Sequence, residues 1–219
     1  MKGVYFVSGI DTDAGKSYAT GVIAAELMNS GLKVITQKFI QTGNEEWSED
    51  IDVHRRIMGT GLLPEDRDHT TAPVIFSYPA SAQLAARIDG REIDLGVIDR
   101  ASATLAGRYD VVLVEGAGGL MVPITDDFMA IDYADTRHLP VILVTNGKLG
   151  SINHTLLSFE AIASRGMNLA MVVYNRHFDT DTVIAEDTHA FIGRYLRKHF
   201  PDTVYRTIDT VDSEDSAEA

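Results

Sequence analysis

The residues best suited to chemistry lie near the N-terminus, in a loop that ends in Gly-Lys-Ser. Gly9 closes an apolar run, and Gly15, Lys16 and Ser17 follow after five intervening residues. Because Gly15 has no Cβ, the backbone N–H groups of such a loop can approach a phosphate closely. Lys16 adds a positive charge for the outer phosphates, and the Ser17 hydroxyl suits a magnesium ion held between them. The loop therefore predicts a binding site for a chain of phosphates.

The segments on either side of this loop are the ones that would position it. The apolar run 4–7 precedes it, and apolar residues recur at helical spacing over 16–29. This strand–loop–helix layout is that of a P-loop. The loop is one residue longer than the usual glycine, four residues and Gly-Lys-Ser/Thr, so an ordinary turn that contains Gly-Lys-Ser is the alternative.

Three further polar residues follow predicted strands. Lys38 and Thr42 come at and just after the end of a strand over 33–38, and Glu115 directly follows the apolar run 110–114. In open α/β sheets, ligands collect beyond the carboxyl ends of the strands. An acid at such a tip, paired with a P-loop, indicates a metal or metal–water ligand. A strand-end charge exposed to water is the alternative for Glu115.

Strands and helices alternate along the chain. We expect strands at 4–7, 33–38, 110–114, 140–144, 169–174 and 203–208, and helices at 16–29, 53–58, 79–87, 93–107, 151–166 and 184–199, with a loop from 59 to 73. The continuous apolar strands predict a parallel sheet buried on both faces. We therefore expect one α/β domain over residues 1–208, a doubly wound, mainly parallel sheet with helices on both faces. Residues 209–219 form an acidic tail that we expect to be mobile.

Composition limits the classes of function. The chain has 219 residues, no cysteine and a formal net charge of −13. Without cysteine there is no disulfide framework, thiolate zinc site or thiol nucleophile. An acidic surface repels nucleic acid and anionic membranes, and no apolar run approaches the length of a membrane span. We expect a cytoplasmic protein that binds neither, with a locally positive nucleotide site. The helix start at 151–153 is a second candidate anion site.

Several motifs, in order, resemble those of dethiobiotin synthase, an enzyme family of biotin biosynthesis. GIDTDAGKS resembles the family's P-loop, which has the same extra residue, and KFIQTG, VEGAGGLMVPIT and KLGSINH resemble three further motifs. Asn175 follows a strand, as the adenine-binding asparagine of the family does. The resemblance covers about residues 3–176. The chain departs from it at Phe39, where proline is usual, and lacks the family's C-terminal loop that contacts the nucleotide base.

The resemblance implies a P-loop NTPase type of fold and a specific reaction. Carbon dioxide forms a carbamate on one amine of 7,8-diaminononanoate, and ATP phosphorylates the carbamate with magnesium present. The second amine then attacks this mixed anhydride, so that dethiobiotin, ADP and phosphate result. The resemblance also implies a homodimer with the diamine at its interface.

The same resemblance implies a role for each matching position. Thr12, Lys16 and Lys38 would be catalytic, and Ser17, Asp50 and Glu115 would bind magnesium, with Asp52 as the alternative to Asp50. The nucleotide would contact Thr12, Asp13, Ala14, Gly15, Lys16, Ser17, Tyr18, Asp50, Glu115, Gly116, Ala117, Gly118, Asn175 and Arg176. The diamine would contact Thr42 and Gly119, and its distal carboxylate would bind Gly150, Ser151, Ile152 and Asn153 of the second subunit.

Two other classes of protein remain as alternatives. One is a related P-loop amide-forming synthase, such as a cobyrinic acid a,c-diamide synthase domain, which carries a glutaminase domain with a nucleophilic cysteine. The other is a nucleotide-dependent switch of the partitioning-ATPase type, which has an additional lysine five positions before the Gly-Lys lysine. This chain has no cysteine, and Asp11 stands at that lysine position. Both observations favour dethiobiotin synthase over these two alternatives.

Overall fold

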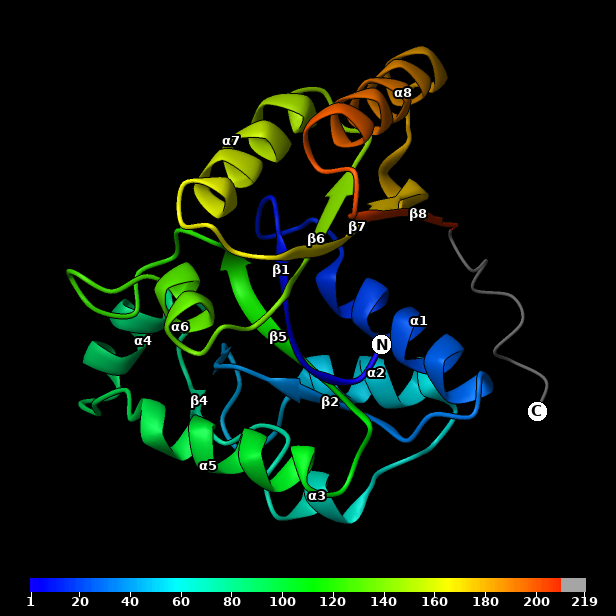
Figure 1. Ribbon diagram of the computed structural model, residues 1–219. Helices are drawn as coiled ribbons and strands as arrows, with labels where there is room; N and C mark the ends of the chain where they lie inside the picture. The colour runs from blue at the N-terminus through cyan, green and yellow to red at the C-terminus, as the bar shows by residue number, and fades with distance from the viewer. Residues whose placement is uncertain (210–219) are drawn as a thin grey trace.

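A six-stranded parallel sheet forms the centre of the molecule (Figure 1). The structure, a computed structural model, describes residues 1–209, so the predicted tail beyond Asp209 lies outside the described residues. The strand order is β2-β5-β1-β6-β7-β8. Their bounds are β1 (Gly3–Gly9), β2 (Val34–Lys38), β5 (Val111–Gly119), β6 (Val141–Asn146), β7 (Leu169–Asn175) and β8 (Val204–Ile208). The prediction of a mainly parallel sheet is confirmed.

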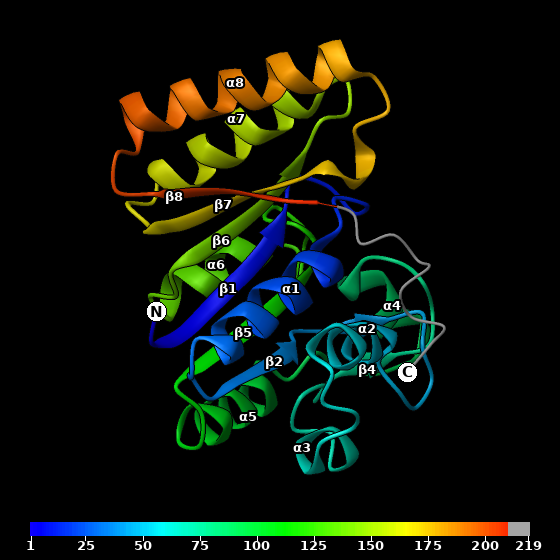
Figure 2. The same cartoon turned by 90° about the vertical axis from the view of Figure 1, so that its right-hand side faces the viewer.

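Helices cover both faces of this sheet. They are α1 (Lys16–Asn29), α2 (Glu49–Met58), α3 (Pro64–Arg67), α4 (Ala82–Ile88), α5 (Leu95–Ala106), α6 (Ala130–Thr136), α7 (Ser151–Ala163) and α8 (Thr182–His199), with a 3₁₀ turn η1 (Arg176–Phe178). Figure 2 shows α1 in front of the sheet and α6 behind it. Two short strands, β3 (Gln41–Thr42) and β4 (Ile75–Phe76), pair in parallel away from the main sheet. The doubly wound arrangement is therefore also confirmed.

The apolar strand residues divide among three cores, and the third joins residues of β6 and β7 to α7 and α8. Those of one face, such as Val7 and Leu113, pack with α1, and those of the other, such as Phe6 and Val114, pack with α4, α5 and α6. Phe39 is fully buried in the second core, and its ring meets that of Phe6 edge-on at a centroid distance of 5.6 Å. Phe39 thus fills space in the core.

Local capping explains where the structure departs from the predicted helices. α2 begins at Glu49 rather than at 53, because Ser48 accepts a hydrogen bond from the backbone N–H of Ile51 at 3.3 Å. α3 interrupts the predicted loop 59–73, and α6 was not predicted at all. Each begins after an apolar residue whose backbone N–H donates to an aspartate three residues later, Leu63 to Asp66 at 2.7 Å and Met129 to Asp132 at 2.8 Å. Sequence patterns that rely on a polar first residue miss such starts.

Strand register carries the polar residues to one edge of the sheet. β2 and β5 pair in parallel with Lys38 opposite Glu115, and β1 pairs with β5 so that Val7 lies opposite the same glutamate. The loop after β1 is the predicted P-loop, so the residues predicted to bind phosphate begin at that edge. Within residues 1–209, no helix is both long enough and apolar enough to cross a membrane.

Candidate active site

A cavity of about 620 Å³ opens at the carboxyl edge of the sheet. Most of the predicted site residues line it, namely Thr12, Asp13, Gly15, Lys16, Ser17, Lys38, Thr42, Asp50, Glu115, Ala117 and Gly118. Ile40, Gln41, Lys148 and Phe178 complete the lining. The fold thus brings together residues from the P-loop, β2, β3, α2 and β5 that are far apart in the sequence.

The P-loop is shaped by Gly15, which precedes the first residue of α1. Its φ of 82° lies in the left-handed region, and a Cβ there would collide with the side-chain amide of Asn175. Lys16 is buried, and its Nζ donates to the carbonyl oxygens of Asp11 at 3.1 Å and Thr12 at 2.9 Å. Burial lowers the pKa of Lys16 to about 8, although the negative charge of Glu115 opposes the shift. The lysine lies on the inner side of its own loop, beside the cavity.

Two carboxylates, a hydroxyl and an ammonium group meet at the base of the cavity. Ser17 Oγ lies 2.5 Å from Asp50 Oδ1 and 3.0 Å from Glu115 Oε1. Lys38 Nζ lies 2.5 Å from Asp50 Oδ2 and 2.8 Å from Glu115 Oε1. Lys38 and Glu115 are buried, whereas Asp50 is partly open to the cavity. The ammonium group of Lys38 is therefore shared between the two acids, which leaves one negative charge for a cation to balance.

Mutual attraction keeps the two buried charges ionised. Burial alone would lower the pKa of Lys38, but the charges of Glu115 and Asp50 outweigh it and raise that pKa above its usual value. Burial alone would raise the pKa of Glu115, but the charge of Lys38 and the hydrogen bonds from His54 and Lys38 hold it well below its usual range. Glu115 is an anion, and Lys38 a cation, throughout the neutral pH range.

The structure distinguishes Asp50 from Asp52. Both lie in the first turn of α2, but residues two apart on a helix point in different directions. Asp50 faces Ser17 and Lys38, whereas Asp52 Oδ1 accepts a hydrogen bond of 2.6 Å from Trp47 Nε1. Asp50 is therefore the acid that lies beside the P-loop hydroxyl.

The oxygen atoms at the base of the cavity suit a magnesium ion. Among residues 1–209, no three or more His, Cys, Asp and Glu side chains form a group that could hold a metal by themselves. Magnesium is usually bound by one or two carboxylates while phosphate oxygens and water complete its shell. The Ser17 hydroxyl with the carboxylates of Asp50 and Glu115 fits that pattern, because the remaining ligands would come from a nucleotide.

Sequence comparisons give the family. A family model described as an AAA domain matches residues 3–208. The chain is 46% identical over 211 residues to the ATP-dependent dethiobiotin synthetase BioD 2 of Pasteurella multocida, covering 96% of this chain and 99% of the relative. Its identity to the protein of that name from Haemophilus influenzae is 48%, covering 87% of this chain and 100% of the relative. The ATP-dependent dethiobiotin synthetase BioD of Chlorobaculum tepidum is 47% identical, with 91% and 84% covered.

The chain belongs to the dethiobiotin synthetase family. The predicted resemblance is therefore confirmed, and so is the expectation of an enzyme. Neither alternative class of protein is favoured by these relatives.

Solved structures of more distant proteins agree on the fold. A ParA family ATPase from Chlorobium tepidum matches 97% of this chain and 86% of its own, with a TM-score of 0.55 and 17% identity. The signal recognition particle receptor FtsY from Elizabethkingia anophelis matches 93% of this chain and 57% of its own, with a TM-score of 0.50 and 15% identity. At these identities the likeness concerns the P-loop fold alone.

Several residues that the family resemblance singles out lie beside the cavity rather than in its lining. Ala14 is buried under the loop, and its carbonyl oxygen accepts a hydrogen bond of 3.5 Å from Asn175 Nδ2. The hydroxyl of Tyr18 donates to the backbone oxygen of Asp209 at 2.9 Å, and Arg176 pairs with the Asp209 carboxylate at 3.4 Å. Asn175 thus borders the P-loop, whereas Tyr18 and Arg176 turn toward the end of β8.

The glycine-rich end of β5, residues 116–119, lies between the main cavity and a second groove. The carbonyl oxygen of Gly116 accepts a hydrogen bond of 3.3 Å from Lys38 Nζ. Gly119 lies in a separate groove of about 430 Å³, which is also lined by Thr12, His154 and Leu157. The segment therefore links the main cavity to this second groove.

The start of α7 lies at a smaller pocket. That pocket, of about 170 Å³, is lined by Asn146, Lys148 and Ser151 together with residues 10–13. Ser151 is buried and its Oγ donates to Asn146 Oδ1 at 2.5 Å, whereas Gly150 and Asn153 are exposed. This pocket shares Thr12, Asp13 and Lys148 with the main cavity, but none of residues 150–153 lines that cavity.

Two features of the site were missed in the sequence. His54 is fully buried on α2, with Nε2 2.6 Å from Glu115 Oε2. Phe178 lines the main cavity, and Lys148 Nζ lies over its ring at 4.0 Å from the centroid. A sequence signal existed for His54, because it follows Asp50 by four residues and so shares its helix face. No comparable signal existed for Phe178, which follows β7 in the short 3₁₀ turn η1.

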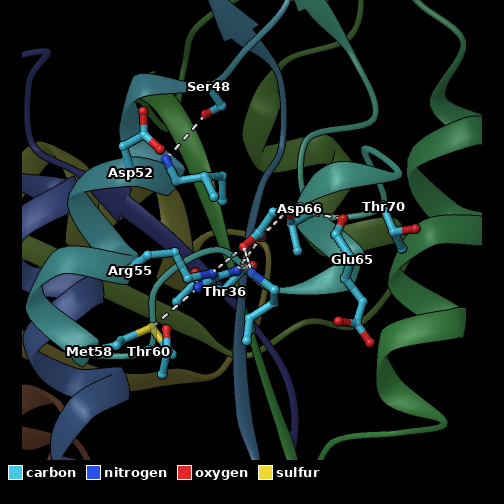
Figure 3. Close-up of polar contacts among 12 residues, drawn as sticks. Thr36, Ser48, Asp52, Arg55, Met58, Thr60, Glu65, Asp66 and Thr70 are labelled. Carbon is cyan, nitrogen blue, oxygen red and sulfur yellow. Dashed lines mark hydrogen bonds and ion pairs between the residues drawn. The ribbon is translucent and has the colours of Figure 1, made fainter.

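A buried ion pair holds α2 against the sheet, as Figure 3 shows. The guanidinium of Arg55 donates from Nε and Nη2 to the two carboxylate oxygens of Asp66, both at 2.8 Å, and from Nη1 to Thr36 Oγ1 at 2.8 Å. Asp66 Oδ1 also accepts from the Thr71 hydroxyl at 2.7 Å. Because Thr36 belongs to β2, this network fixes the helix that carries Asp50 to the strand that carries Lys38.

Proposed function

We propose that this protein is an ATP- and magnesium-dependent dethiobiotin synthetase that closes a cyclic urea on 7,8-diaminononanoate with carbon dioxide. The observation that carries the proposal is the meeting of Lys16, Ser17, Lys38, Asp50 and Glu115 in one cavity. Such a set is suited to binding phosphate and neutralising its charge. A phosphoryl transfer between two bound substrates needs no more than this.

The chemical steps balance without a protein nucleophile. One amine of the diamine adds to carbon dioxide and loses a proton, which gives a carbamate anion. A carbamate oxygen attacks the γ-phosphorus of ATP and ADP leaves. The second amine then attacks the carbamoyl carbon of this anhydride, inorganic phosphate leaves, and the ring closes. Each anionic partner must approach another anion, so charge neutralisation is the main task of the protein.

The P-loop and Lys38 would perform that neutralisation. Backbone N–H groups over 12–17 and the start of α1 would surround the phosphates, and Lys16 Nζ lies where it can turn from its loop carbonyls to the outer phosphates. Magnesium, when bound by Ser17, Asp50 and Glu115, would neutralise charge between the β- and γ-phosphates. Lys38 would contact the transferring phosphoryl group, and Thr42 the carbamate.

Lys38 is oriented for this role by the acids around it. Its Nζ already contacts Asp50, Glu115 and the carbonyl oxygen of Gly116. A metal ion near the same carboxylates would compete with the ammonium group for them. We therefore propose that Lys38 would turn from these carboxylates toward the phosphoryl oxygens once nucleotide and magnesium are bound.

The remaining proposals concern the ends of the two substrates and the assembly. Asn175 would read adenine, since its amide lies against the P-loop. The distal carboxylate of the diamine would bind at 150–153 of a second subunit, which agrees with the absence of these four residues from the lining of the cavity that contains Thr42. We thus propose a homodimer with the diamine at its interface, and a cytoplasmic location, where ATP is available.

One incubation tests the proposed reaction. Purified protein is mixed with ATP, magnesium, ¹³C-labelled bicarbonate and 7,8-diaminononanoate, and the product is analysed by mass spectrometry. We expect dethiobiotin that carries one ¹³C atom and ADP release that depends on the diamine. The Lys16→Ala variant is the control and should form neither. ADP release that is indifferent to the diamine, without dethiobiotin, would instead favour a nucleotide-dependent switch.

A further inference from the structure

His54 is a buried polar residue in contact with the proposed metal site. It lies on the face of α2 that turns toward the sheet, and no part of its side chain is exposed. Its Nε2 lies 2.6 Å from Glu115 Oε2. Because an ionised carboxylate can only accept hydrogen bonds, Nε2 carries the proton and donates it.

The other ring nitrogen of His54, Nδ1, adds no hydrogen bond within the described residues. Nδ1 is buried and has no hydrogen-bond partner among the residues that the structure describes. Burying such an atom costs stability, and an aliphatic side chain of similar size would fill the same space without that cost. The contact with Glu115 is therefore the polar interaction that distinguishes histidine from leucine at this position.

The contact divides the two oxygens of Glu115 between different tasks. Oε2 accepts from His54, while Oε1 lies 3.0 Å from Ser17 Oγ and 2.8 Å from Lys38 Nζ. Because each oxygen has its own hydrogen-bond partners, rotation of the carboxylate would break a buried hydrogen bond. Oε1 is thus held toward the hydroxyl and the cavity.

We propose that His54 is a positioning residue that fixes Glu115 so that Oε1 faces the magnesium ion shared with the nucleotide. The inference rests on the proposed function, because it concerns the same metal. It assigns His54 no contact with substrate or metal. Partners that orient a metal-binding side chain in this way commonly change metal affinity by about 10- to 100-fold when they are lost.

Two substitutions at position 54 separate hydrogen bonding from packing. His54→Leu keeps most of the volume and removes the donor, whereas His54→Gln places an amide N–H near the position of Nε2. The matched control is Ile51→Val, which removes one methylene from another buried residue of the same helix, whose side chain takes no part in the charge cluster at Glu115. Should His54→Leu fail to melt cooperatively, His54→Asn, whose amide is too short to reach Oε2, replaces it.

The readout is metal binding itself. Mn²⁺ is titrated into each protein with saturating ADP, free Mn²⁺ is measured by electron paramagnetic resonance, and the Mn²⁺ held by ADP in a protein-free titration is subtracted. We expect His54→Leu to raise the Kd for Mn²⁺ by at least about tenfold. His54→Gln should recover most of the affinity, and Ile51→Val should bind as the wild type does. In turnover, His54→Leu should lower kcat and leave the KM of the diamine unchanged.

The outcomes that overturn the proposal differ from those that overturn the function. Mn²⁺ affinity of a folded His54→Leu protein within about twofold of wild type would refute the role of His54 alone. So would a His54→Gln protein as weak as His54→Leu, because the donated hydrogen bond would then be irrelevant. If the wild-type protein with ADP bound no Mn²⁺, the magnesium site itself would be wrong, and the role of His54 with it.

Discussion

At the scale of single residues, the candidate site is a small set of charges that satisfy one another. Lys38 contacts Asp50 and Glu115, and Ser17 lies within hydrogen-bonding distance of both acids. Buried charges are tolerated only when they are paired, so removal of one member changes the energy of all the others. Substitutions here should therefore act on turnover more strongly than on substrate affinity.

Lys38→Gln should lower kcat by at least about a hundredfold, because a donor aimed at developing charge acts mainly in the transition state. The measurement is diamine-dependent ADP release over a range of both substrates. Lys33→Gln is the matched control, since it removes the same charge from the exposed start of the same segment. A rise in KM with kcat preserved would assign Lys38 to ground-state binding instead.

Nucleotide binding should take up a proton at alkaline pH. The pKa of Lys16 in the free protein is lowered to about 8 by burial, and the negative charge of bound phosphates would raise it again. At about pH 8.5, binding should therefore take up roughly three quarters of a proton, and affinity should fall as pH rises further. Calorimetry in buffers of different ionisation enthalpy measures this uptake.

The Lys16→Arg variant is the control for that experiment, because a guanidinium stays charged throughout this range. We expect the Lys16→Arg protein to bind nucleotide more weakly than the wild type and to take up no proton when it binds. Equal proton uptake by the two proteins would mean that a different group titrates.

The site residues that could be predicted are those fixed by a local motif. Gly15, Lys16 and Ser17 follow a strand and open a helix, and Glu115 ends a buried strand, so sequence order alone indicates their neighbourhood. His54 was not predicted as a site residue, because its partner Glu115 lies 61 residues away in the sequence. A contact between α2 and β5 depends on packing, which no local spacing encodes.

At the scale of secondary structure, α2 is the element whose placement matters most. It carries Asp50 and His54, and the Arg55–Asp66 pair holds it to β2 and α3 (Figure 3). The pair is buried and bidentate, and Thr71 and the backbone N–H of Leu63 satisfy the same carboxylate. Breaking this pair would loosen α2 and so displace Asp50 and His54 from their positions in the site.

Asp66→Asn should lower the free energy of unfolding by about 3 to 5 kcal/mol, because Arg55 would remain buried without its anion. Urea unfolding followed by circular dichroism measures the loss. Asp68→Asn, which removes an exposed charge two residues away, should change stability little. Equal stabilities of the Asp66→Asn protein and the wild type would show that the pair contributes nothing.

The free energies of unfolding of the wild type and the Asp66→Asn protein should converge at acidic pH. Burial alone would raise the pKa of Asp66, but the hydrogen bonds and charge of Arg55 lower it below its usual value. Its contribution is thus fully present above about pH 4 and is lost as pH falls through the lowered folded-state pKa. The stability gap between wild type and Asp66→Asn should therefore narrow as pH falls below about 4.

The sheet could be predicted because buried parallel strands need continuous apolar runs, such as 111–114 and 141–144. The strands β3 and β4 could not be predicted, because each has two residues and forms only by pairing with the other. α6 could not either, because it has seven residues and begins at an apolar position. Short elements that depend on tertiary contacts leave no periodic signal.

At the scale of the whole molecule, exposed apolar side chains gather beside the P-loop. Met121 and Leu157 line the groove that contains Gly119, with 56% and 61% of their surface exposed, and Leu149 at the start of α7 is 86% exposed. Apolar surface of this kind often marks a contact between proteins. Its position next to 150–153 agrees with the homodimer proposed above.

Analytical ultracentrifugation should show a dimer at micromolar concentration. Leu157→Glu should shift it to a monomer, because a carboxylate would be buried in an apolar contact, and activity should fall with it. Val183→Glu, at a 77% exposed position on α8, is the control and should stay dimeric. A fully active monomer would refute the shared substrate site.

The contact between Trp47 and Asp52 has a practical consequence. The chain contains a single tryptophan, and its indole is bonded to the first turn of the helix that carries Asp50, with the His69 ring 6.3 Å away. Its fluorescence therefore reports on the surroundings of the start of that helix, including His69. Any shift of the helix when nucleotide enters would alter the emission of an intrinsic probe, so its motion can be followed in real time without a chemical label.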